Sequence, residues 1–233
     1  DYAVERDYYD VVDGFCLGDT VDGMIREAMA TPLDFIPGTQ HDYSNIGFTL
    51  LGVAIEHVSG SPFEDYLRDN ILAPMGMQSS RVHVIGHVPT PREASGHRWN
   101  EELGALAKDE VVTLPVTAPD GGLVTTLGDF VKWADIYFGE TQSILTEESI
   151  QRMTSPVHSA GEDDARGAAQ SYGYGLYTSQ SLLSHPGYIV GFRSHFVLDR
   201  EKQILIVVFS NNTTNVPSKL TAGLLDILES SAP

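Results

Sequence analysis

The tripeptide Tyr43-Ser44-Asn45 carries a phenol and an amide two residues apart. Pro37-Gly38 is a turn signal a few residues upstream, so the tripeptide is expected where a loop enters a helix. In that place the phenol of Tyr43 can relay a proton, and the amide of Asn45 can hold a substrate carbonyl or orient a lysine. The alternative is structural: Asn45 caps the helix that follows, and Tyr43 packs.

A second cluster, Ser184-His185-Pro186-Gly187-Tyr188, places a histidine at a predicted strand end, and Gly191 follows it. Glycines beside a histidine indicate backbone that lies close to a ligand, so Gly187 and Gly191 are predicted to contact substrate. The N–H that follows Gly187 belongs to Tyr188 and can donate to a developing oxyanion. A lone histidine is more often a structural residue, and His185 could be one.

Apolar spacing predicts the helices that position these clusters. Residues 46–58 read as a broadly buried helix, and Ser59-Gly60 ends it because glycine takes the left-handed conformation at no steric cost. Ser61-Pro62-Phe63-Glu64 starts a second helix with a capping box and with proline at the first helical position. Further helices are expected at about 21–29, at about 127–138, after Thr146 and from Pro217.

Three strands are expected in the last third of the chain, at 172–178, 191–198 and 203–210, whereas residues 155–170 read as a polar, mobile loop. Asp199-Arg200-Glu201-Lys202 forms a tight hairpin between the second and third strands. Helices followed by an antiparallel sheet with a terminal helix packed on it indicate an α+β fold. We divide the chain into a mainly helical region, 1–115, and a region of helices, three strands and the C-terminal helix, 116–233.

Composition argues against several classes of function. The 233 residues hold 32 acidic and 14 basic side chains, a formal net charge of −18, whereas nucleic-acid binding needs clustered lysine and arginine. No run of about 18 apolar residues is present, so no membrane span is expected. The single cysteine, Cys16, cannot form an internal disulfide. His83, His87 and His97 lack a carboxylate motif, so no metal and no other cofactor is expected.

Taken together and in order, these segments resemble the class C β-lactamase-like serine hydrolases, which include D,D-peptidases, D-aminopeptidases and family VIII esterases. The resemblance covers essentially the whole chain from about residue 30 onward. It rests on the segments Phe35-x-Pro-Gly-Thr-x-x-x-Tyr-Ser-Asn-x-Gly-Phe-x-Leu-Leu-Gly, Glu56-x-Val-Ser-Gly, Ile71-Leu-x-Pro-Met-Gly-Met, Pro119-Asp-Gly-Gly-Leu-Val-Thr-Thr-x-x-Asp129 and His185-Pro186-Gly187. It implies a β-lactamase/penicillin-binding-protein-like fold, in which a helical region adjoins an antiparallel sheet flanked by helices.

The resemblance also implies a role for each residue of the two clusters. Tyr43 would be the general base or acid that shuttles a proton to the leaving group. Asn45 would hold the acyl-side amide of the substrate and the catalytic lysine. His185 stands where the family carries lysine or histidine, and would take the cationic or hydrogen-bonding place on the edge strand. The backbone N–H of Tyr188 would form half of the oxyanion hole.

The Ser-x-x-Lys motif of this family is absent from the 233 residues, because Ala105, Asp129, Asp199 and Val216 stand three positions before the four lysines. In the family, the helix that carries this motif and two strands before it precede the part present here. We therefore expect one catalytic domain that is incomplete at its N-terminus. The missing segment would be a covalent part of the polypeptide or a partner chain, and without its strands the strand at 203–210 would offer an unpaired edge.

The leading hypothesis is a serine hydrolase of esterase or peptidase type that acts on a small amide, ester or peptide substrate. His185 in place of lysine argues against an efficient β-lactamase, because lysine offers a permanent cation for a substrate carboxylate. The alternative is a non-catalytic relative that binds peptide or cell-wall fragments. Composition leaves the compartment open, and the family favours the periplasm or the extracellular medium.

If the nucleophile lies outside these residues, the 233-residue chain alone forms no covalent adduct with a fluorophosphonate or a penicillin. Intact-mass spectrometry after incubation with either probe measures this, and the expected mass shift is zero. A stoichiometric adduct on any residue within 1–233 would contradict the hypothesis.

Overall fold

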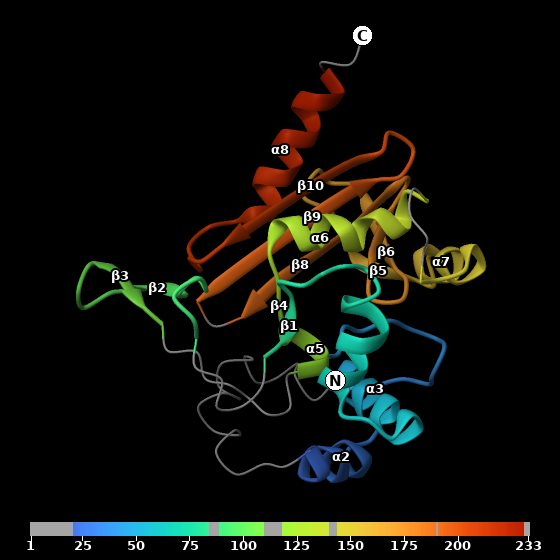
Figure 1. The fold of residues 1–233 in the computed structure, drawn as a ribbon. Helices are drawn as coiled ribbons and strands as arrows, with labels where there is room; N and C mark the ends of the chain where they lie inside the picture. The colour runs from blue at the N-terminus through green and yellow to red at the C-terminus, as the bar shows by residue number, and fades with distance from the viewer. Residues whose placement is uncertain (1–20, 84–88, 110–117, 140–143, 190, 231–233) are drawn as a thin grey trace. The chain divides into compact units, whose positions relative to one another are not determined.

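The structure is a computed structural model that describes residues 21–83, 89–109, 118–139, 144–189 and 191–230 (Figure 1). The chain divides into two compact units, of which the first comprises residues 1–88 and 112–129 and the second residues 89–111 and 130–233. The predicted division between residues 115 and 116 lies outside the described residues.

The first unit contains short helices and a two-stranded antiparallel ladder. Its helices are α2 (Val21–Ala30), α3 (Asn45–Ser59), α4 (Phe63–Leu67) and α5 (Ala118–Gly121), and a π-helical turn, Arg68–Leu72, extends α4. The ladder pairs β1 (Arg81–Val82) with β4 (Leu123–Val124). The helices predicted in the first 70 residues are therefore confirmed.

Ser44 and Gly60 set the two ends of α3. Ser44 is the N-cap residue, and its side-chain Oγ accepts a hydrogen bond of 3.1 Å from the N–H of Gly47. The alternative in which Asn45 caps this helix is therefore wrong. Gly60 ends the helix as predicted, with a φ of 70° and an N–H that donates to the carbonyl of Glu56.

The capping box predicted at the start of α4 does not form. Pro62 is the N-cap residue, and no side chain of its own turn caps the helix. Instead, a carboxylate oxygen of Glu56 in α3 accepts a 2.9 Å hydrogen bond from the N–H of Phe63. The N–H of Ser61 donates to the hydroxyl of Ser59, so this tight turn brings the end of α3 close enough to supply the cap.

One side of α3 is exposed, contrary to the broadly buried helix that the sequence predicted. Thr49 and Gly52 are buried, whereas Leu51 is 58% and Val58 85% exposed. In the described part of the first unit, α3 packs on α4 and α5, and these two short helices cover only one of its sides. Apolar spacing alone could not show which side would be covered.

The contact between α3 and α5 is close at Gly52. A Cβ atom at this position would lie 2.3 Å from Cγ and 2.6 Å from Cβ of Pro119, which is closer than real Cβ atoms approach other carbons. Glycine therefore lets the ring of Pro119 rest directly on the backbone of α3. Asp120 follows Pro119 in α5, so this contact fixes the backbone that carries Asp120.

The second unit is built on a six-stranded antiparallel sheet in the order β10-β9-β8-β7-β6-β5. Its strands are β5 (His158–Asp163), β6 (Ala169–Tyr172), β7 (Tyr177–Ser179), β8 (Leu182–Ile189), β9 (Phe192–Asp199) and β10 (Ile204–Ser210). The second unit also contains the hairpin of β2 (His97–Asn100) and β3 (Ala105–Lys108), and the helices α7 (Glu147–Thr154) and α8 (Pro217–Ser230). Helix α6 (Leu127–Ala134) belongs to this unit from residue 130 onward, and a 3-10 turn (Asp135–Tyr137) follows it.

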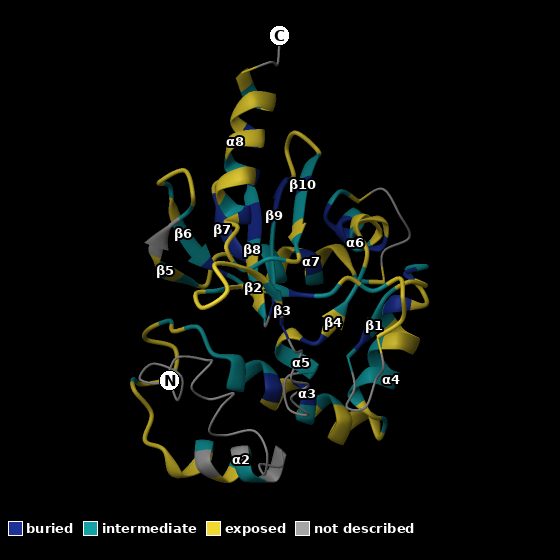
Figure 2. Cartoon of the chain, turned by 90° about the vertical axis from the view of Figure 1, so that its left-hand side faces the viewer, coloured by how far each residue is buried: buried dark blue, intermediate teal, exposed yellow. Residues whose placement is uncertain are grey.

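Helices cover both faces of this sheet. On one face, the ring of Phe130 in α6 lies 5.2 Å from that of Phe196 and 5.8 Å from that of Phe209. On the other face, α8 packs on β9 and β10, and its Leu225 is buried against Val197. Adjacent residues of a strand point to opposite faces, so Phe196 and Val197 contact different helices. Buried residues follow the central strands of the sheet (Figure 2).

The sheet is larger than the three strands that the sequence predicted. β9, β10 and their tight hairpin are confirmed, with Oδ1 of Asp199 accepting hydrogen bonds from the N–H groups of Glu201 and Lys202. The predicted strand at 172–178 is interrupted between β6 and β7. The prediction of a loop at 155–170 is wrong, because β5 and the start of β6 pair there with an irregular register.

The substitution Gly52→Ala is expected to lower the free energy of unfolding by about 1–3 kcal/mol, because the added methyl group overlaps the ring of Pro119. Gly223→Ala in α8 is the matched control. A Cβ there meets nothing within 4 Å, so the change adds helix propensity and stabilises by up to about 1 kcal/mol. Urea unfolding measures both, and a Gly52→Ala variant as stable as the wild type would contradict the close approach.

Candidate active site

The first cluster of candidate residues lies at the N-terminus of α3. Tyr43 precedes the N-cap residue and is partly buried, and Asn45 is the first residue of the helix. Because Ser44 provides the cap, the amide of Asn45 is not used for it. Among the described residues the Asn45 side chain makes no hydrogen bond, so both its donor and its acceptor remain for a ligand.

Asp120 in α5 joins this cluster, although the sequence interpretation did not select it. Its carboxyl oxygen Oδ1 is buried and has no hydrogen-bond partner in the part of the chain that the structure describes. Burial raises the pKa of Asp120 to about 7, and hydrogen bonds from the backbone N–H groups of Asp120 and Gly121 partly oppose this rise. The available signal was an acid surrounded by Ala118-Pro119 and Gly121-Gly122, with no other charged side chain between Glu110 and Asp129.

Tyr43 and Asp120 influence each other electrostatically. Burial raises the pKa of the Tyr43 phenol above its ordinary value, and the negative charge of Asp120 raises it further. Tyr43 therefore keeps its proton at neutral pH. The first cluster brings together a protonated phenol, a carboxyl group that titrates near neutral pH and an amide.

His185 lies inside β8, and the predicted position at a strand end is wrong. Its Nδ1 is 2.5 Å from the carbonyl oxygen of Pro186, so Nδ1 carries the proton and donates. Its Nε2 then accepts from the hydroxyl of Tyr172 at 3.1 Å. Burial lowers the pKa of His185, and the hydrogen bond to Pro186 opposes this change only in part. The imidazole is therefore neutral at pH 7.

Gly187 and Tyr188 lie in the part of β8 that extends beyond β7. β9 pairs with all of β8, whereas β7 pairs only with Leu182–Ser184. Among the described strands, residues 185–189 therefore have a partner on one side and an open edge on the other. The side chain of Tyr188 is 48% exposed, and the guanidinium of Arg193 lies 4.3 Å from the centre of its ring in a cation–π contact.

Gly191, in the turn between β8 and β9, meets the backbone at Gly96. A Cβ atom at Gly191 would lie 2.6 Å from the Cα atom of Gly96, and the φ of Gly191 is 75°, so glycine is required for two reasons. The N–H of His97 donates to the carbonyl of Gly191 at 3.1 Å. The structure thus assigns Gly191 to a backbone contact, and its contact with substrate stays a prediction.

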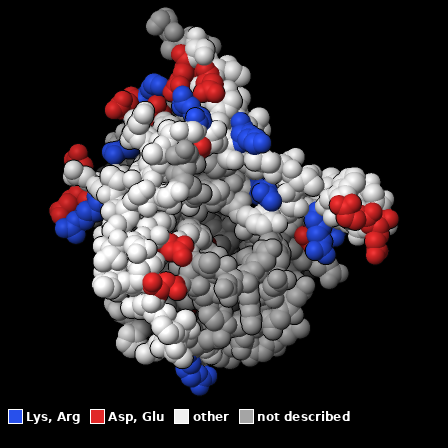
Figure 3. Space-filling view, turned by 180° about the vertical axis from the view of Figure 1, so that it is seen from behind, with Lys and Arg blue, Asp and Glu red and all other residues white. Residues whose placement is uncertain are grey.

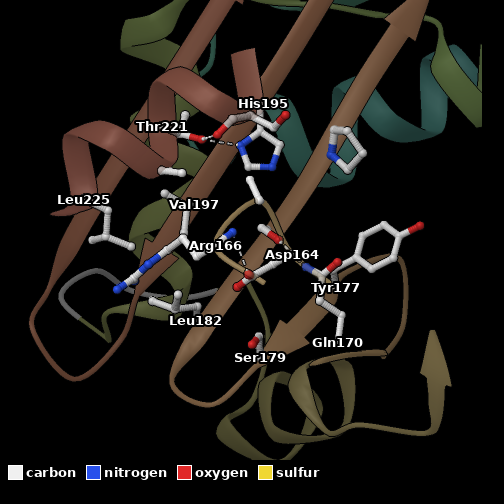
Figure 4. Close-up of a pocket in the computed structure, with 15 residues that line it drawn as sticks. Asp164, Arg166, Gln170, Tyr177, Ser179, Leu182, His195, Val197, Thr221 and Leu225 are labelled. Atoms are coloured by element: carbon white, nitrogen blue, oxygen red, sulfur yellow. Dashed lines mark hydrogen bonds between the residues drawn. The ribbon is translucent and has the colours of Figure 1, made fainter. Parts of the chain in front are cut away.

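A pocket of about 280 Å³ lies on the face of the sheet that α8 covers (Figure 4). Ser184, Pro186 and His195 line it, so strand alternation directs the His185 side chain to the opposite face. At the edge of the pocket, Arg166 forms ion pairs with Glu229 and Asp226 of α8. Acidic and basic side chains are intermixed at this end of the second unit (Figure 3).

His195 is held in one tautomer in this pocket. The Thr221 hydroxyl donates to the carbonyl of Ser218 at 3.0 Å, so it accepts from Nδ1 of His195 at 2.7 Å. Burial lowers the pKa of His195 to about 4, and the nearby His185 adds to the effect. His185 and His195 are therefore both uncharged at neutral pH.

Comparison with known proteins identifies the family. Residues 1–229 match the family model described as Beta-lactamase. The chain belongs to the beta-lactamase family. The resemblance inferred from the Tyr-Ser-Asn and His-Pro-Gly motifs is thus confirmed, and so is the predicted β-lactamase/penicillin-binding-protein-like fold of helices and antiparallel sheet.

Three related proteins are considerably longer than this chain. The octameric penicillin-binding protein homologue from Pyrococcus abyssi is 28% identical, with a TM-score of 0.79 over 91% of this chain and 48% of its own. The D-amino acid amidase from Ochrobactrum anthropi SV3 is 24% identical, with a TM-score of 0.67 over 91% of this chain and 65% of its own. Protein flp of Staphylococcus aureus (strain MW2) is 24% identical over 85% of this chain and 39% of flp. The chain therefore spans less than two thirds of each of these relatives.

Neither a membrane-spanning helix nor a metal-binding cluster is found among the described residues. No helix there is both long and apolar enough to cross a bilayer. No group of three or more histidine, cysteine, aspartate or glutamate side chains there is arranged to hold a metal ion.

The lowered pKa of His195 predicts that the free energy of unfolding depends on pH. An unfolded histidine takes up a proton near pH 6.5, whereas folded His195 does so only near pH 4. Between these values the unfolded state binds more protons, so this histidine makes the free energy of unfolding fall as the pH is lowered from about 6.5 to about 4. His195→Asn keeps a donor for Thr221 and is expected to reduce that fall.

Urea unfolding between pH 4 and pH 7.5 measures this dependence. His57→Asn is the matched control for the substitution itself, because it replaces an exposed histidine on α3. An unchanged fall of stability in His195→Asn would show that this histidine is not responsible.

Proposed function

We propose that the protein hydrolyses small amides or esters by acyl transfer, with the attacking serine supplied from outside these 233 residues. The match of residues 1–229 to the beta-lactamase family carries this proposal. The structural neighbour that is a D-amino acid amidase supports an amide among the substrates. The 233 residues contain no Ser-x-x-Lys motif, so the serine and its lysine are assigned to the polypeptide outside them.

The proposed reaction begins when the serine Oγ attacks the substrate carbonyl carbon and loses its proton to a base. Backbone N–H groups stabilise the oxyanion that forms. The bond to the leaving nitrogen or oxygen then breaks as that atom receives a proton, and water hydrolyses the acyl-serine. These residues would supply the proton donor, part of the oxyanion hole and the groups that orient the substrate.

Tyr43 is the proposed proton donor to the leaving group. Its raised pKa supports this role, because the phenol remains protonated at neutral pH and has a proton to give. Asn45, with its amide unused by the helix cap, is proposed to hold the acyl-side amide of the substrate and the lysine. The two roles are compatible because a rigid helix start carries both side chains.

Tyr188 is proposed to donate its backbone N–H to the oxyanion. Proline has no N–H, so Pro186 is accommodated in β8 without loss of a ladder hydrogen bond if its nitrogen faces the open edge. Backbone groups of residues two apart face the same edge of a strand, so the N–H of Tyr188 would then be directed to that edge as well. This arrangement supports an oxyanion-hole role.

His185 is proposed to contact the substrate as a neutral hydrogen-bonding group. Its lowered pKa and its contacts with Tyr172 and Pro186 argue against a permanent cation. A neutral imidazole recognises a substrate carboxylate more weakly than lysine does. The proposed substrates are therefore simple esters and amides rather than carboxylate-bearing β-lactams.

Tyr43→Phe tests the proposal in the complete protein, assayed with p-nitrophenyl butyrate and an amino-acid p-nitroanilide. Loss of the proton donor is expected to lower kcat by about 100-fold or more, with a smaller effect on KM. Tyr66→Phe in α4 is the matched control and should retain wild-type rates. If Tyr43→Phe also retains them, Tyr43 has no part in the mechanism, and a wild-type protein that turns over neither substrate would favour the non-catalytic alternative.

A further inference from the structure

Tyr172 is a buried tyrosine whose hydroxyl reaches one of the candidate site residues. It stands at the end of β6 and is 7% exposed, and its hydroxyl oxygen lies 3.1 Å from Nε2 of His185 in β8. In the sheet, β7 lies between these two strands. The hydrogen bond therefore joins side chains of strands that are not direct neighbours.

The imidazole of His185 has a hydrogen-bond partner on each of its nitrogens. Nδ1 donates to the carbonyl oxygen of Pro186, so Nε2 is an acceptor, and the Tyr172 hydroxyl supplies a donor for it. Which nitrogen of a histidine carries the proton depends on the partners of both. Together these two partners fix the tautomer of the ring and its rotation.

Tyr177 in β7 keeps the Tyr172 ring in its place. The centre of the Tyr177 ring lies 4.8 Å from that of Tyr172 and 5.4 Å from that of His185, and Tyr177 is itself buried. The two tyrosine rings meet edge to face, which is a favourable arrangement for aromatic side chains. The Tyr172 ring cannot turn away from His185 without disturbing this packing.

The end of α7 fixes the backbone on either side of Tyr172. The N–H of Val157 donates to the carbonyl of Tyr172 at 3.0 Å, and the N–H of Tyr174 donates to the carbonyl of Met153 at 3.1 Å. A Cβ atom at Gly173 would lie 2.5 Å from the same Met153 oxygen, so α7 contacts the chain directly after Tyr172. Rigid elements of this kind hold a functional group most precisely.

We propose that Tyr172 is a positioning residue for the acyl-transfer reaction, because its hydroxyl holds the His185 imidazole in the tautomer and orientation that contact the substrate. This inference rests on the proposed function, in which His185 forms a hydrogen bond with the substrate. In the free protein the hydroxyl occupies the lone pair of Nε2, and a substrate N–H can take its place without turning the ring. Tyr172 therefore acts through His185 and transfers no proton to the substrate.

Tyr172→Phe removes the hydroxyl and keeps the ring. In the complete protein, assayed with alanine p-nitroanilide, kcat/KM is expected to fall about 5- to 10-fold, which corresponds to one hydrogen bond. The change should appear mainly as a higher KM, because Tyr172 affects substrate binding and not proton transfer. Tyr174→Phe is the matched control: Tyr174 is 63% exposed, and its variant should retain wild-type kcat and KM.

A double-mutant cycle with His185→Leu distinguishes positioning from a merely structural role. If Tyr172 acts through His185, Tyr172→Phe causes no further loss of kcat/KM once His185 has been replaced. If instead the losses of the two single variants multiply in the double variant, Tyr172 acts independently of His185 and the proposal is overturned.

Nitrogen NMR of the His185 imidazole tests the hydrogen bond without turnover. Loss of the O–H donor should move the Nε2 resonance downfield in Tyr172→Phe and leave it in place in Tyr174→Phe. An unchanged resonance in Tyr172→Phe would overturn the positioning role even in an active enzyme. If the wild type turns over no substrate, the proposed function fails, whereas a shifted resonance still supports the hold of Tyr172 on His185.

Discussion

Both candidate clusters depend on close backbone approaches that leave no room for a Cβ atom. In the first unit, Gly52 lets Pro119 rest on α3, which holds Asp120 near Tyr43. In the second unit, Gly96 and Gly191 meet at the turn that follows Tyr188. Close-packed backbone is stiffer than a network of long side chains, so these contacts fix the backbone that carries the chemical groups.

Desolvation then sets the charge state of the candidate groups. Burial raises the pKa of Tyr43 and lowers that of His185, so both side chains are neutral at pH 7. Burial likewise raises the pKa of Asp120 to about 7, so this carboxyl group changes its charge near neutral pH.

Both the sequence match and the fold place the chain in the beta-lactamase family. Its match extends over residues 1–229, and the fold resembles that of the penicillin-binding protein homologue from Pyrococcus abyssi. This chain differs from the lysine-bearing form of the family motif at His185, where a neutral imidazole is bonded to Tyr172 and Pro186.

Local sequence signals and strong periodicity were sufficient to predict many of the helices and strands. The apolar spacing of α3, α8, β9 and β10, the left-handed glycine at Gly60 and the Asp199–Lys202 hairpin could be predicted, because each depends on residues close together in the chain. Ordered sequence motifs were enough to identify the family and to select Tyr43, Asn45 and His185.

Tertiary structure alone decided the features that depend on residues far apart in sequence. Glu56 caps α4 in place of Ser61, the irregular β5–β6 pair replaces a loop, and α3 is buried on one side only. The pKa of Asp120 is raised by burial, and the contact of the preceding Pro119 with Gly52 joins segments almost 70 residues apart in the chain. Sequence patterns indicate which residues favour a helix or an exposed position. The burial of a side chain, and therefore its pKa, depends on which distant segment of the chain covers it.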